Sequence, residues 1–341
     1  MSKKYNIAVV GATGNVGRQI ISGLSDRGFA VDNIYAVASA QSLGQQISYG
    51  DQNLDIDNLE GFNFSGVDIV FLAVSSKLAQ ELAPKITKHG AVVIDNSSYW
   101  RQNAKVPLVI PEINPLDLKH YGKLNIIANP NCSTIQMLMA LHPLDQQVPI
   151  KRVVVATYQS VAGAGKDAMD ELYQQTKARY VFKELVPEHF PKVIAFNCIP
   201  QIDSFLPSGL TKEEFKMQAE TNKILGRDVP VNASCVRVPT FGGHAESVNV
   251  EFEDEITVED AIEILADSPG IMVTDSKDNQ LYATPMDANG EDLILISRLR
   301  EDNTVEHGLN MWLVGDPLRK GAATNAIQIA EELIKNYKIS N

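Results

Sequence analysis

Cysteine is scarce in this sequence. Its 341 residues include three cysteines, Cys132, Cys198 and Cys235, and no two of them have the close spacing of a metal-binding pair. An odd and sparse set of this kind argues against a disulfide framework and against a zinc site. We therefore predict a protein without a bound metal that works in a reducing compartment, the cytoplasm.

Long apolar runs and basic runs are also absent. No segment approaches the ~20 consecutive apolar residues of a membrane span, and the first five residues lack the apolar core of a signal peptide. Lys and Arg number 30 against 42 Asp and Glu, which gives a net charge of −12. We therefore expect neither nucleic acid nor a membrane surface as a partner, although a small phosphorylated ligand needs only a few local donors.

Short apolar segments alternate with helical patterns in the first part of the chain, and the clearest helical pattern covers residues 76–88. Near-continuous apolar strands between helices are typical of a parallel sheet covered on both faces. The expected strands cover residues 5–10, 33–38, 67–74, 91–95 and 125–128. We therefore predict an α/β fold with an N-terminal domain of the Rossmann type.

From residue 151 onward, several expected strands alternate polar with apolar side chains, most clearly at residues 247–252. This pattern predicts an antiparallel or mixed sheet with one less buried face. The expected strands cover residues 151–159, 234–238, 246–252, 292–300 and 308–314, and the expected helices cover residues 165–177, 212–225, 258–266 and 320–338. We predict an α+β catalytic and oligomerisation domain at residues 131–319, and a dinucleotide-binding domain at 1–130 plus 320–341.

A glycine-rich turn follows the first expected strand, with the sequence Gly-Ala-Thr-Gly-Asn-Val-Gly at residues 11–17. Gly11 allows a tight turn, Gly14 lets the backbone approach a pyrophosphate, and Gly17 permits close packing of helix on sheet. The pattern predicts dinucleotide binding by Gly11, Thr13, Gly14, Asn15, Val16 and Gly17. A purely structural turn is the alternative.

The end of the second expected strand lacks the Asp or Glu that binds the ribose 2′-hydroxyl of NAD. Ser39, Gln41 and Ser42 could instead donate hydrogen bonds to the 2′-phosphate of NADP. We therefore predict NADP as the cofactor. The alternative is that these three residues are solvated loop residues.

Cys132 is a candidate nucleophile. It lies between the expected strand 125–128 and an apolar helical run that begins at Ser133. A helix N-terminus lowers the pKa of a thiol, and its free N–H groups can hold an oxyanion. Such a thiolate can attack an aldehyde, and a nicotinamide can oxidise the adduct to a thioester. Cys198 and Cys235 lie in apolar runs and are expected to be buried and inert.

A second reading of the chemistry uses different residues. Ser160, Tyr173 and Lys177 have the Ser…Tyr-x-x-x-Lys spacing of short-chain dehydrogenases, in which the tyrosine is a general acid. The same spacing is also one face of any amphipathic helix. This alternative stays open at this point.

Eight short motifs occur together in one order. They cover residues 11–17, 97–101, 109–112, 129–134, 158–166, 220–223, 237–244 and 318–325. With them the chain resembles the aspartate-semialdehyde dehydrogenases over nearly its whole length. Glu220-x-x-Lys223 without longer insertions resembles the Gram-positive-like form of that family.

The resemblance implies roles for individual residues. Cys132 is the implied nucleophile, His244 the acid/base and Gln159 the residue that orients the acyl-enzyme. His244 is expected on a glycine-rich turn between strands, because Gly242 and Gly243 precede it.

The same resemblance implies a substrate and phosphate site. Arg237 and Glu220 correspond to the pair that binds the α-carboxylate and the α-amino group. Arg101, Asn131 and Lys223 resemble the phosphate site, and Asn325 belongs to the cofactor site.

One position departs from the family pattern, because Gln41 stands where an arginine usually contacts the 2′-phosphate. The NADP preference is therefore expected to be weaker than usual. The implied reaction is the NADPH-dependent interconversion of L-aspartyl 4-phosphate and L-aspartate 4-semialdehyde, in a homodimer or homotetramer. Two alternatives remain, a related acyl-phosphate reductase such as N-acetyl-glutamyl-phosphate reductase and a catalytically silent relative.

Overall fold

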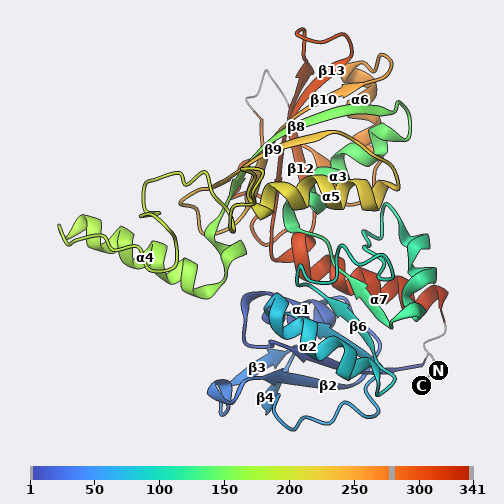
Figure 1. The fold of residues 1–341 in the computed structure, drawn as a ribbon, viewed down its shortest axis with the longest axis vertical. Helices are drawn as coiled ribbons and strands as arrows, with labels where there is room; N and C mark the ends of the chain where they lie inside the picture. The colour runs from blue at the N-terminus through green and yellow to red at the C-terminus, as the bar shows by residue number, and fades with distance from the viewer. Residues whose placement is uncertain (1–2, 276–280, 338–341) are drawn as a thin grey trace. The chain divides into compact units, whose positions relative to one another are not determined.

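The computed structural model describes residues 3–275 and 281–337. The chain divides into two compact units, Met1–Pro130 with Ala322–Asn341, and Asn131–Gly321. One of the two sheets lies in each unit, and Figure 1 labels several strands of each. Each unit is described by itself.

The first unit contains a mostly parallel sheet with the strand order β3-β4-β2-β1-β5-β6-β7. The β3–β4 pair is antiparallel and the other pairs are parallel. The strands are β1 (Tyr5–Val10), β2 (Val31–Ala38), β3 (Gln46–Tyr49), β4 (Gln52–Asn58), β5 (Ile69–Leu72), β6 (Val92–Asp95) and β7 (Ile126–Ala128), and the helices are α1 (Asn15–Asp26), α2 (Ser76–Thr87) and α7 (Thr324–Asn336). The predicted Rossmann-type sheet is confirmed.

Helix α7 belongs to the core of the first unit although it comes from the end of the chain. Its buried face joins the same apolar cluster as β1, β5 and α1. The approach of α7 to α1 is close, because a Cβ on Gly23 would lie 2.7 Å from Cδ1 of Ile327. Burial of this apolar stripe explains why the last helix returns to the first domain.

The second unit contains a mixed sheet with the strand order β11-β12-β13-β10-β8-β9. The outer pairs β11–β12 and β8–β9 are parallel, and the central pairs are antiparallel. The strands are β8 (Ile150–Gln159), β9 (Val231–Arg237), β10 (His244–Phe252), β11 (Ile271–Val273), β12 (Ile294–Glu301) and β13 (Gly308–Gly315), and the helices are α3 (Cys132–Asp145), α4 (Lys166–Tyr180), α5 (Lys212–Leu225) and α6 (Val258–Ala266). The predicted mixed sheet is confirmed.

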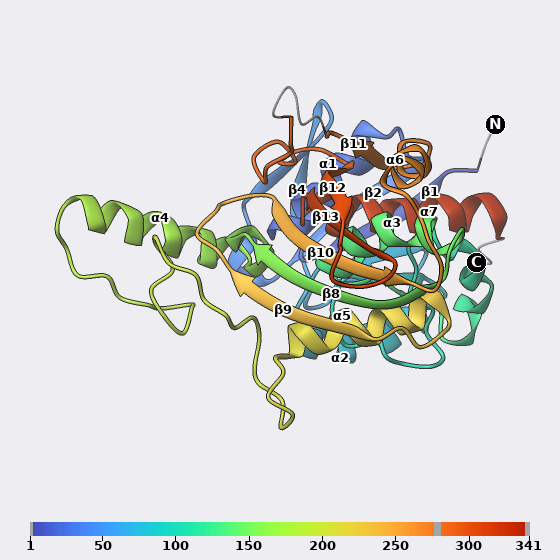
Figure 2. The same ribbon diagram turned by 90° about the horizontal axis from the view of Figure 1, so that it is seen from above.

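Helix α3 is the central helix of the second unit. It packs on β10, β12 and β13 and also on α5 and α6, so most of its side chains are buried. Helix α5 runs along β9, whereas α4 extends away from the sheet (Figure 2). A helix that is apolar on all sides has to be enclosed in this way.

Some elements differ from the sequence-based expectation. The edge hairpin β3–β4 and the short β11 were not predicted, because few of their residues are buried. The expected helix 320–338 is a π-helix (Arg319–Ala323) followed by α7, and Lys338 lies outside the described residues. The short 3₁₀ segments are Ala40–Ser42, Pro115–Lys123 and Val161–Ala164.

Candidate active site

Cys132 is the first residue of α3, and its side chain is partly exposed. The preceding residue, Asn131, caps the helix. Its Oδ1 accepts the N–H groups of Ser133 at 3.0 Å and of Thr134 at 3.3 Å. The thiol therefore lies at the positive end of a capped, buried helix, in the position that the sequence predicted.

Helix α5 holds Asn131 through two glutamates. Asn131 donates its Nδ2 to Oε1 of Glu213 at 2.8 Å, and its backbone N–H to Oε2 of Glu220 at 2.6 Å. Glu213 and Glu220 are two turns apart on the same face of α5. The residue before the thiol is thus fixed from both its side chain and its backbone.

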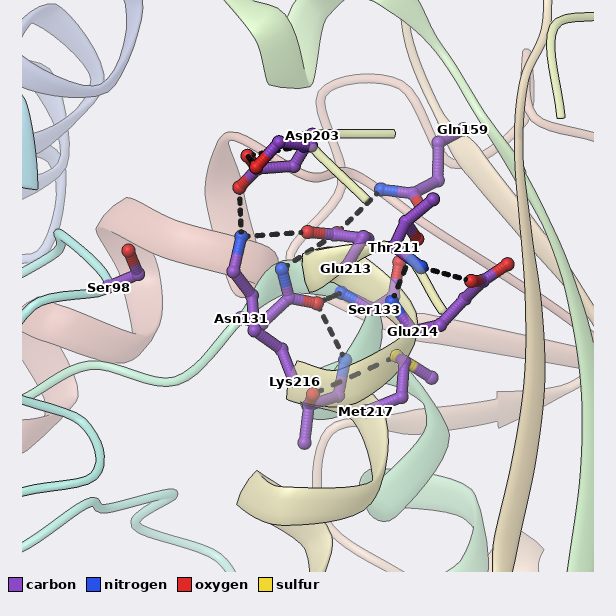
Figure 3. Close-up of polar contacts among 12 residues, drawn as sticks. Ser98, Asn131, Ser133, Gln159, Asp203, Thr211, Glu213, Glu214, Lys216 and Met217 are labelled. Atoms are coloured by element: carbon purple, nitrogen blue, oxygen red, sulfur yellow. Dashed lines mark hydrogen bonds and ion pairs between the residues drawn. The ribbon is translucent and has the colours of Figure 1, made fainter. Parts of the chain in front are cut away.

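Glu213 is the centre of a group of polar contacts (Figure 3). Besides Asn131 it binds Nε2 of Gln159 at 3.1 Å and Nζ of Lys216 at 3.1 Å. Lys216 also pairs with Asp203 at 3.1 Å. Burial alone would raise the pKa of Glu213, but Lys216 and the hydrogen bonds from Asn131 and Gln159 outweigh it and lower the pKa to about 2. Glu213 is therefore a buried anion at neutral pH.

Three more candidates meet at one edge of the second sheet. Gln159 ends β8 and Arg237 ends β9, and the two residues are register partners. His244 begins β10, which runs antiparallel to β8. A Cβ on Gly163 would lie 3.0 Å from Nε2 of His244 and 3.6 Å from Nη1 of Arg237. The strand ends thus bring an amide, a guanidinium and an imidazole together.

Arg237 is a buried cation whose Nη1 donates to the carbonyl oxygen of Ser160 at 2.6 Å. Burial lowers the pKa of Arg237, and the charges of Glu213, Cys132 and Cys235 oppose this effect. Arg237 therefore lies within electrostatic reach of both the anion Glu213 and the predicted nucleophile.

His244 is fully buried. Burial lowers its pKa first and the charge of Arg237 lowers it further, to about 3, although Glu213 partly opposes them. The ring is therefore neutral at physiological pH. His244 directly follows the glycine-rich turn rather than lying on it, since it is the first residue of β10 and Gly243, with φ of +69°, precedes it.

Glu246 lies two residues further along β10, on the same face as His244, and is also fully buried. Burial raises its pKa well above the ordinary value of 4.5, the nearby Ser133 hydroxyl partly opposes this rise, and the charge of Glu213 adds to it. Glu213 is therefore charged at neutral pH, whereas Glu246 is neutral.

The glycine-rich turn of the first unit has the steric requirements that the sequence predicted. Gly11 has φ of +83°, and a Cβ there would lie 2.1 Å from the carbonyl oxygen of Ala73. A Cβ on Gly17 would lie 2.2 Å from the carbonyl oxygen of Gly11. Gly14 occupies the N-cap of α1, so no side chain caps that helix, and Asn15 and Val16 form its first turn.

The candidates for the 2′-phosphate are not equivalent. Ser39 and Gln41 are exposed, whereas Ser42 is buried and its hydroxyl lies 3.1 Å from that of Thr13. Ser39 and Gln41 are therefore the accessible donors at the end of β2.

Two further predicted residues belong to the first unit, and a third lies at the end of α5. Arg101, in the first unit, is buried and donates Nη2 to the carbonyl of Asn96 at 3.0 Å. Asn325, also in the first unit, donates Nδ2 to the carbonyl of Val109 at 3.0 Å. Lys223 lies in the last turn of α5, about 15 Å along the helix axis from Glu213 at 1.5 Å per residue.

The sequence analysis missed Glu213 and Lys216. Helix α5 carries the spacing Glu-x-x-Lys twice, at 213–216 and at 220–223. The pairs are seven residues apart, so both lie on one helix face, and spacing does not distinguish them. The contacts distinguish them, since the Glu213 carboxylate accepts hydrogen bonds from Gln159 and Lys216, whereas that of Glu220 accepts the backbone N–H of Asn131.

One other expectation was wrong, and one alternative reading loses its support. Cys198 is exposed rather than buried, because its segment is a loop in which Ile199 alone forms a bridge to Arg237. Tyr173 is 56% exposed and Lys177 is exposed on α4, whereas Ser160 is fully buried. The short-chain dehydrogenase triad is therefore not assembled.

Within residues 3–275 and 281–337, no cluster of His, Cys, Asp and Glu could hold a metal ion. In the same part of the chain, no helix combines the length and the apolar character that a membrane crossing requires.

Comparisons with known proteins assign a family. Models described as the NAD binding domain and the dimerisation domain of semialdehyde dehydrogenases match residues 6–121 and 141–320. Aspartate-semialdehyde dehydrogenases of Rickettsia conorii and Aquifex aeolicus are each 48% identical to this chain, over 99% and 97% of it and 100% and 98% of their own lengths. The structure of aspartate semialdehyde dehydrogenase II from Vibrio cholerae complexed with ASA covers 99% of the chain and 100% of its own, with 44% identity and a TM-score of 0.97. The chain belongs to the aspartate-semialdehyde dehydrogenase family.

Proposed function

We propose that this chain catalyses the reversible, NADPH-dependent conversion of L-aspartyl 4-phosphate to L-aspartate 4-semialdehyde and phosphate. This step leads to diaminopimelate, lysine, threonine and methionine. The observation that best supports this proposal is the thiol of Cys132 at the start of α3. The charge of Cys132 and the anion Glu213 both interact electrostatically with the buried Arg237. A zwitterionic amino-acid substrate needs one cationic and one anionic partner of this kind.

Cys132 is the proposed nucleophile. Its thiolate forms a bond to the acyl carbon, the bond from that carbon to the phosphate oxygen breaks, and phosphate leaves with the electron pair. The positive end of α3 stabilises both the thiolate and the oxyanion of this step. Gln159 orients the acyl group. NADPH, when bound, would supply the hydride that reduces the thioester to a hemithioacetal, whose oxygen His244 stabilises with a proton. The carbon–sulfur bond then breaks, the electron pair returns to the Cys132 sulfur as the thiolate, and the aldehyde leaves.

The substrate contacts are revised from those that the sequence implied. Arg237 binds the α-carboxylate, and Glu213 replaces Glu220 as the partner of the α-amino group, because Glu220 is fully buried against the backbone of Asn131. Lys216 replaces Lys223 as the cation for phosphate, since it lies beside Glu213. Arg101 and Asn131 remain predicted phosphate ligands.

The turn at residues 11–17 fits the pyrophosphate of a dinucleotide. Its glycines keep the backbone tight, and the first turn of α1 has no side-chain cap that would compete with an anion for the helix N-terminus. Ser39 and Gln41 are placed to contact a 2′-phosphate, while Asn325 is a further predicted cofactor residue. The values of kcat/KM for NADP and for NAD can be compared between wild type and Gln41→Arg. The comparison measures how much a positive charge at position 41 contributes to the preference for NADP.

The direct test is reduction of NADP by aspartate semialdehyde in the presence of phosphate or arsenate. Cys132→Ser is expected to lose turnover, whereas the exposed Cys198→Ser keeps it as the matched thiol control. Tyr173→Phe is expected to be active. Full activity of Cys132→Ser contradicts the covalent mechanism. Preference for an N-acylated substrate favours an N-acetyl-glutamyl-phosphate reductase, and inactivity with every acyl phosphate favours a silent relative.

We also propose that the chain forms a homodimer or homotetramer in the cytoplasm. The match to a dimerisation-domain model supports an oligomer. Tyr158 and Trp312 pack together on the sheet face opposite the active site and leave aromatic surface exposed there. Light scattering after size-exclusion chromatography distinguishes the two assemblies from a monomer. Free cysteines fit a reducing compartment.

A further inference from the structure

Ser160 contacts the ring of His244 through two of its groups. Its backbone N–H lies 3.1 Å from Nδ1 of His244, and its hydroxyl oxygen lies 3.0 Å from the same atom. Both residues are fully buried. On the other side of the ring, Nε2 is buried and has no hydrogen-bond partner among the residues that the structure describes.

The backbone contact determines where the proton of the ring lies. A backbone N–H can only donate, so Nδ1 of His244 has to accept with its lone pair. A neutral imidazole whose Nδ1 accepts carries its proton on Nε2. The Ser160 hydroxyl can rotate to donate to the same lone pair, which adds to this preference. The opposite tautomer would direct an N–H of the ring at an N–H of the backbone.

The charged groups around the ring keep it neutral. Burial lowers the pKa of His244 most, and Arg237 on β9 lowers it further. Glu213 on α5 and a backbone hydrogen bond with Gly243 oppose them only in part, so the pKa falls to about 3. At neutral pH the ring is therefore uncharged, and the relevant equilibrium is between its two neutral tautomers.

Ser160 also fixes the neighbour of the ring. Its carbonyl oxygen accepts Nη1 of Arg237 at 2.6 Å. The segment is held in turn, because the N–H of Val161 donates to the carbonyl of Thr240 at 2.9 Å. The N–H, hydroxyl and carbonyl of one residue thus position both His244 and Arg237.

We infer that Ser160 is a positioning residue that holds His244 in the Nε2–H tautomer, so that the ring offers a proton donor on the side of Gly163 and Arg237. This inference rests on the proposed function. In that reaction the ring stabilises the developing hemithioacetal oxygen with its Nε2 proton. It does not begin the reaction as a base at Nε2. Ser160, which sequence spacing connected with Tyr173, acts on a different residue.

The tautomer can be measured without an activity assay. In the ¹⁵N-labelled full-length protein, with His244 assigned by comparison with His244→Asn, we expect Nδ1 to resonate as an unprotonated ring nitrogen and Nε2 as a protonated one. The pattern should stay unchanged between about pH 5.5 and pH 8, because the ring is buried and neutral. A protonated Nδ1, or titration near the ordinary pKa of histidine, overturns the inference.

Kinetics of Ser160 variants test the contribution of the hydroxyl. Ser160→Ala keeps the backbone N–H and loses one hydrogen bond, so kcat should fall up to about tenfold with a smaller change in KM. Ser160→Thr should recover most of the loss. Ser297→Ala is the matched control, because Ser297 is equally buried and its hydroxyl accepts the N–H of Ala283 at 2.8 Å.

The outcomes separate this inference from the proposed function. An active Cys132→Ser protein contradicts the proposed function, while the ring spectra still report the tautomer. Ring spectra and kcat of Ser160→Ala that equal those of wild type contradict the role of the hydroxyl. If kcat falls equally in Ser160→Ala and Ser297→Ala, then the Ser160 hydroxyl contributes only to the structure and the positioning role is contradicted.

Discussion

The two Glu-x-x-Lys pairs of α5 share spacing, helix and face, yet they differ in what they contact. Glu213 binds Asn131, Gln159 and Lys216. Glu220 accepts the backbone N–H of Asn131 at 2.6 Å. The first pair therefore belongs to a charged network that reaches the strand ends, and the second supports the loop before the thiol. The roles of the two glutamates therefore depend on which turn of α5 lies next to the ends of β8 and β9.

The largest expected effect comes from removing one carboxylate charge at a time. Glu213→Gln removes the buried anion that pairs with Lys216 and opposes the effect of burial on Arg237. The value of kcat/KM for aspartate semialdehyde should therefore fall about 10³-fold, since breaking a buried charge pair costs about 2–5 kcal/mol. Glu220→Gln still accepts the N–H of Asn131 through its amide oxygen and should lose less than about tenfold. Equal losses, or the reverse order, would show that the predicted pair at 220–223 binds the substrate.

The pH dependence of stability should separate the same two variants. The pKa of Glu213 falls from 4.5 to about 2 on folding. A lowered pKa stabilises the folded state above about pH 4.5, and this stabilisation is lost as the pH falls towards about 2. Such a shift corresponds to about 3 kcal/mol. Urea unfolding at pH 7, 4.5 and 3 should show a steeper loss in wild type and Glu220→Gln than in Glu213→Gln. Parallel curves for all three proteins would contradict the assignment.

Sequence patterns predicted the features that depend on local order. Apolar periodicity indicated both sheets, and the glycines at 11 and 17 occupy positions where a Cβ would overlap backbone atoms. Cys132 was found because a strand, a proline and a helix follow one another in the chain. These signals are local, so the sequence alone carries them.

The features that the sequence did not predict depend on contacts between distant segments. The register of β8 and β9 brings Gln159 to Arg237, and nothing near residue 213 indicates that α5 begins opposite them. The burial of His244 depends likewise on the strands beside β10, and the exposure of Cys198 on a loop that forms no strand. Apolar segments of similar composition can lie either in a buried strand or in an exposed loop, because the neighbouring segments decide which.

The lysines of the two pairs should differ less than the glutamates, because they are nearer to solvent. Lys216 contacts Glu213 and Asp203, each at 3.1 Å. Lys216→Met should raise the KM for phosphate about 30-fold, from the loss of a charged hydrogen bond. Lys223→Met should stay within about threefold of wild type. Phosphate saturation curves in the oxidative direction measure both, and a larger effect of Lys223→Met would restore the sequence-based assignment.

The smallest expected effect concerns the residue that sets where α5 begins. Thr211 caps the helix, since its hydroxyl accepts the N–H of Glu214 at 3.3 Å and the Glu214 side chain accepts the N–H of Thr211 at 2.6 Å. Thr211→Ala should cost about 1 kcal/mol of folding free energy. Thr257→Ala, at the cap of α6, should cost a similar amount and serves as the matched control.

The two cap variants, Thr211→Ala and Thr257→Ala, should differ in enzymatic activity. Because the first turn of α5 carries Glu213, loosening that turn should lower kcat/KM about twofold to threefold in Thr211→Ala. Thr257→Ala should leave kcat/KM unchanged, since α6 carries none of the proposed site residues. Thermal unfolding and steady-state kinetics on the same preparations check both. If the two variants lose stability and keep full activity alike, then the contacts of Glu213 with Asn131 and Gln159, rather than the cap, position the first turn.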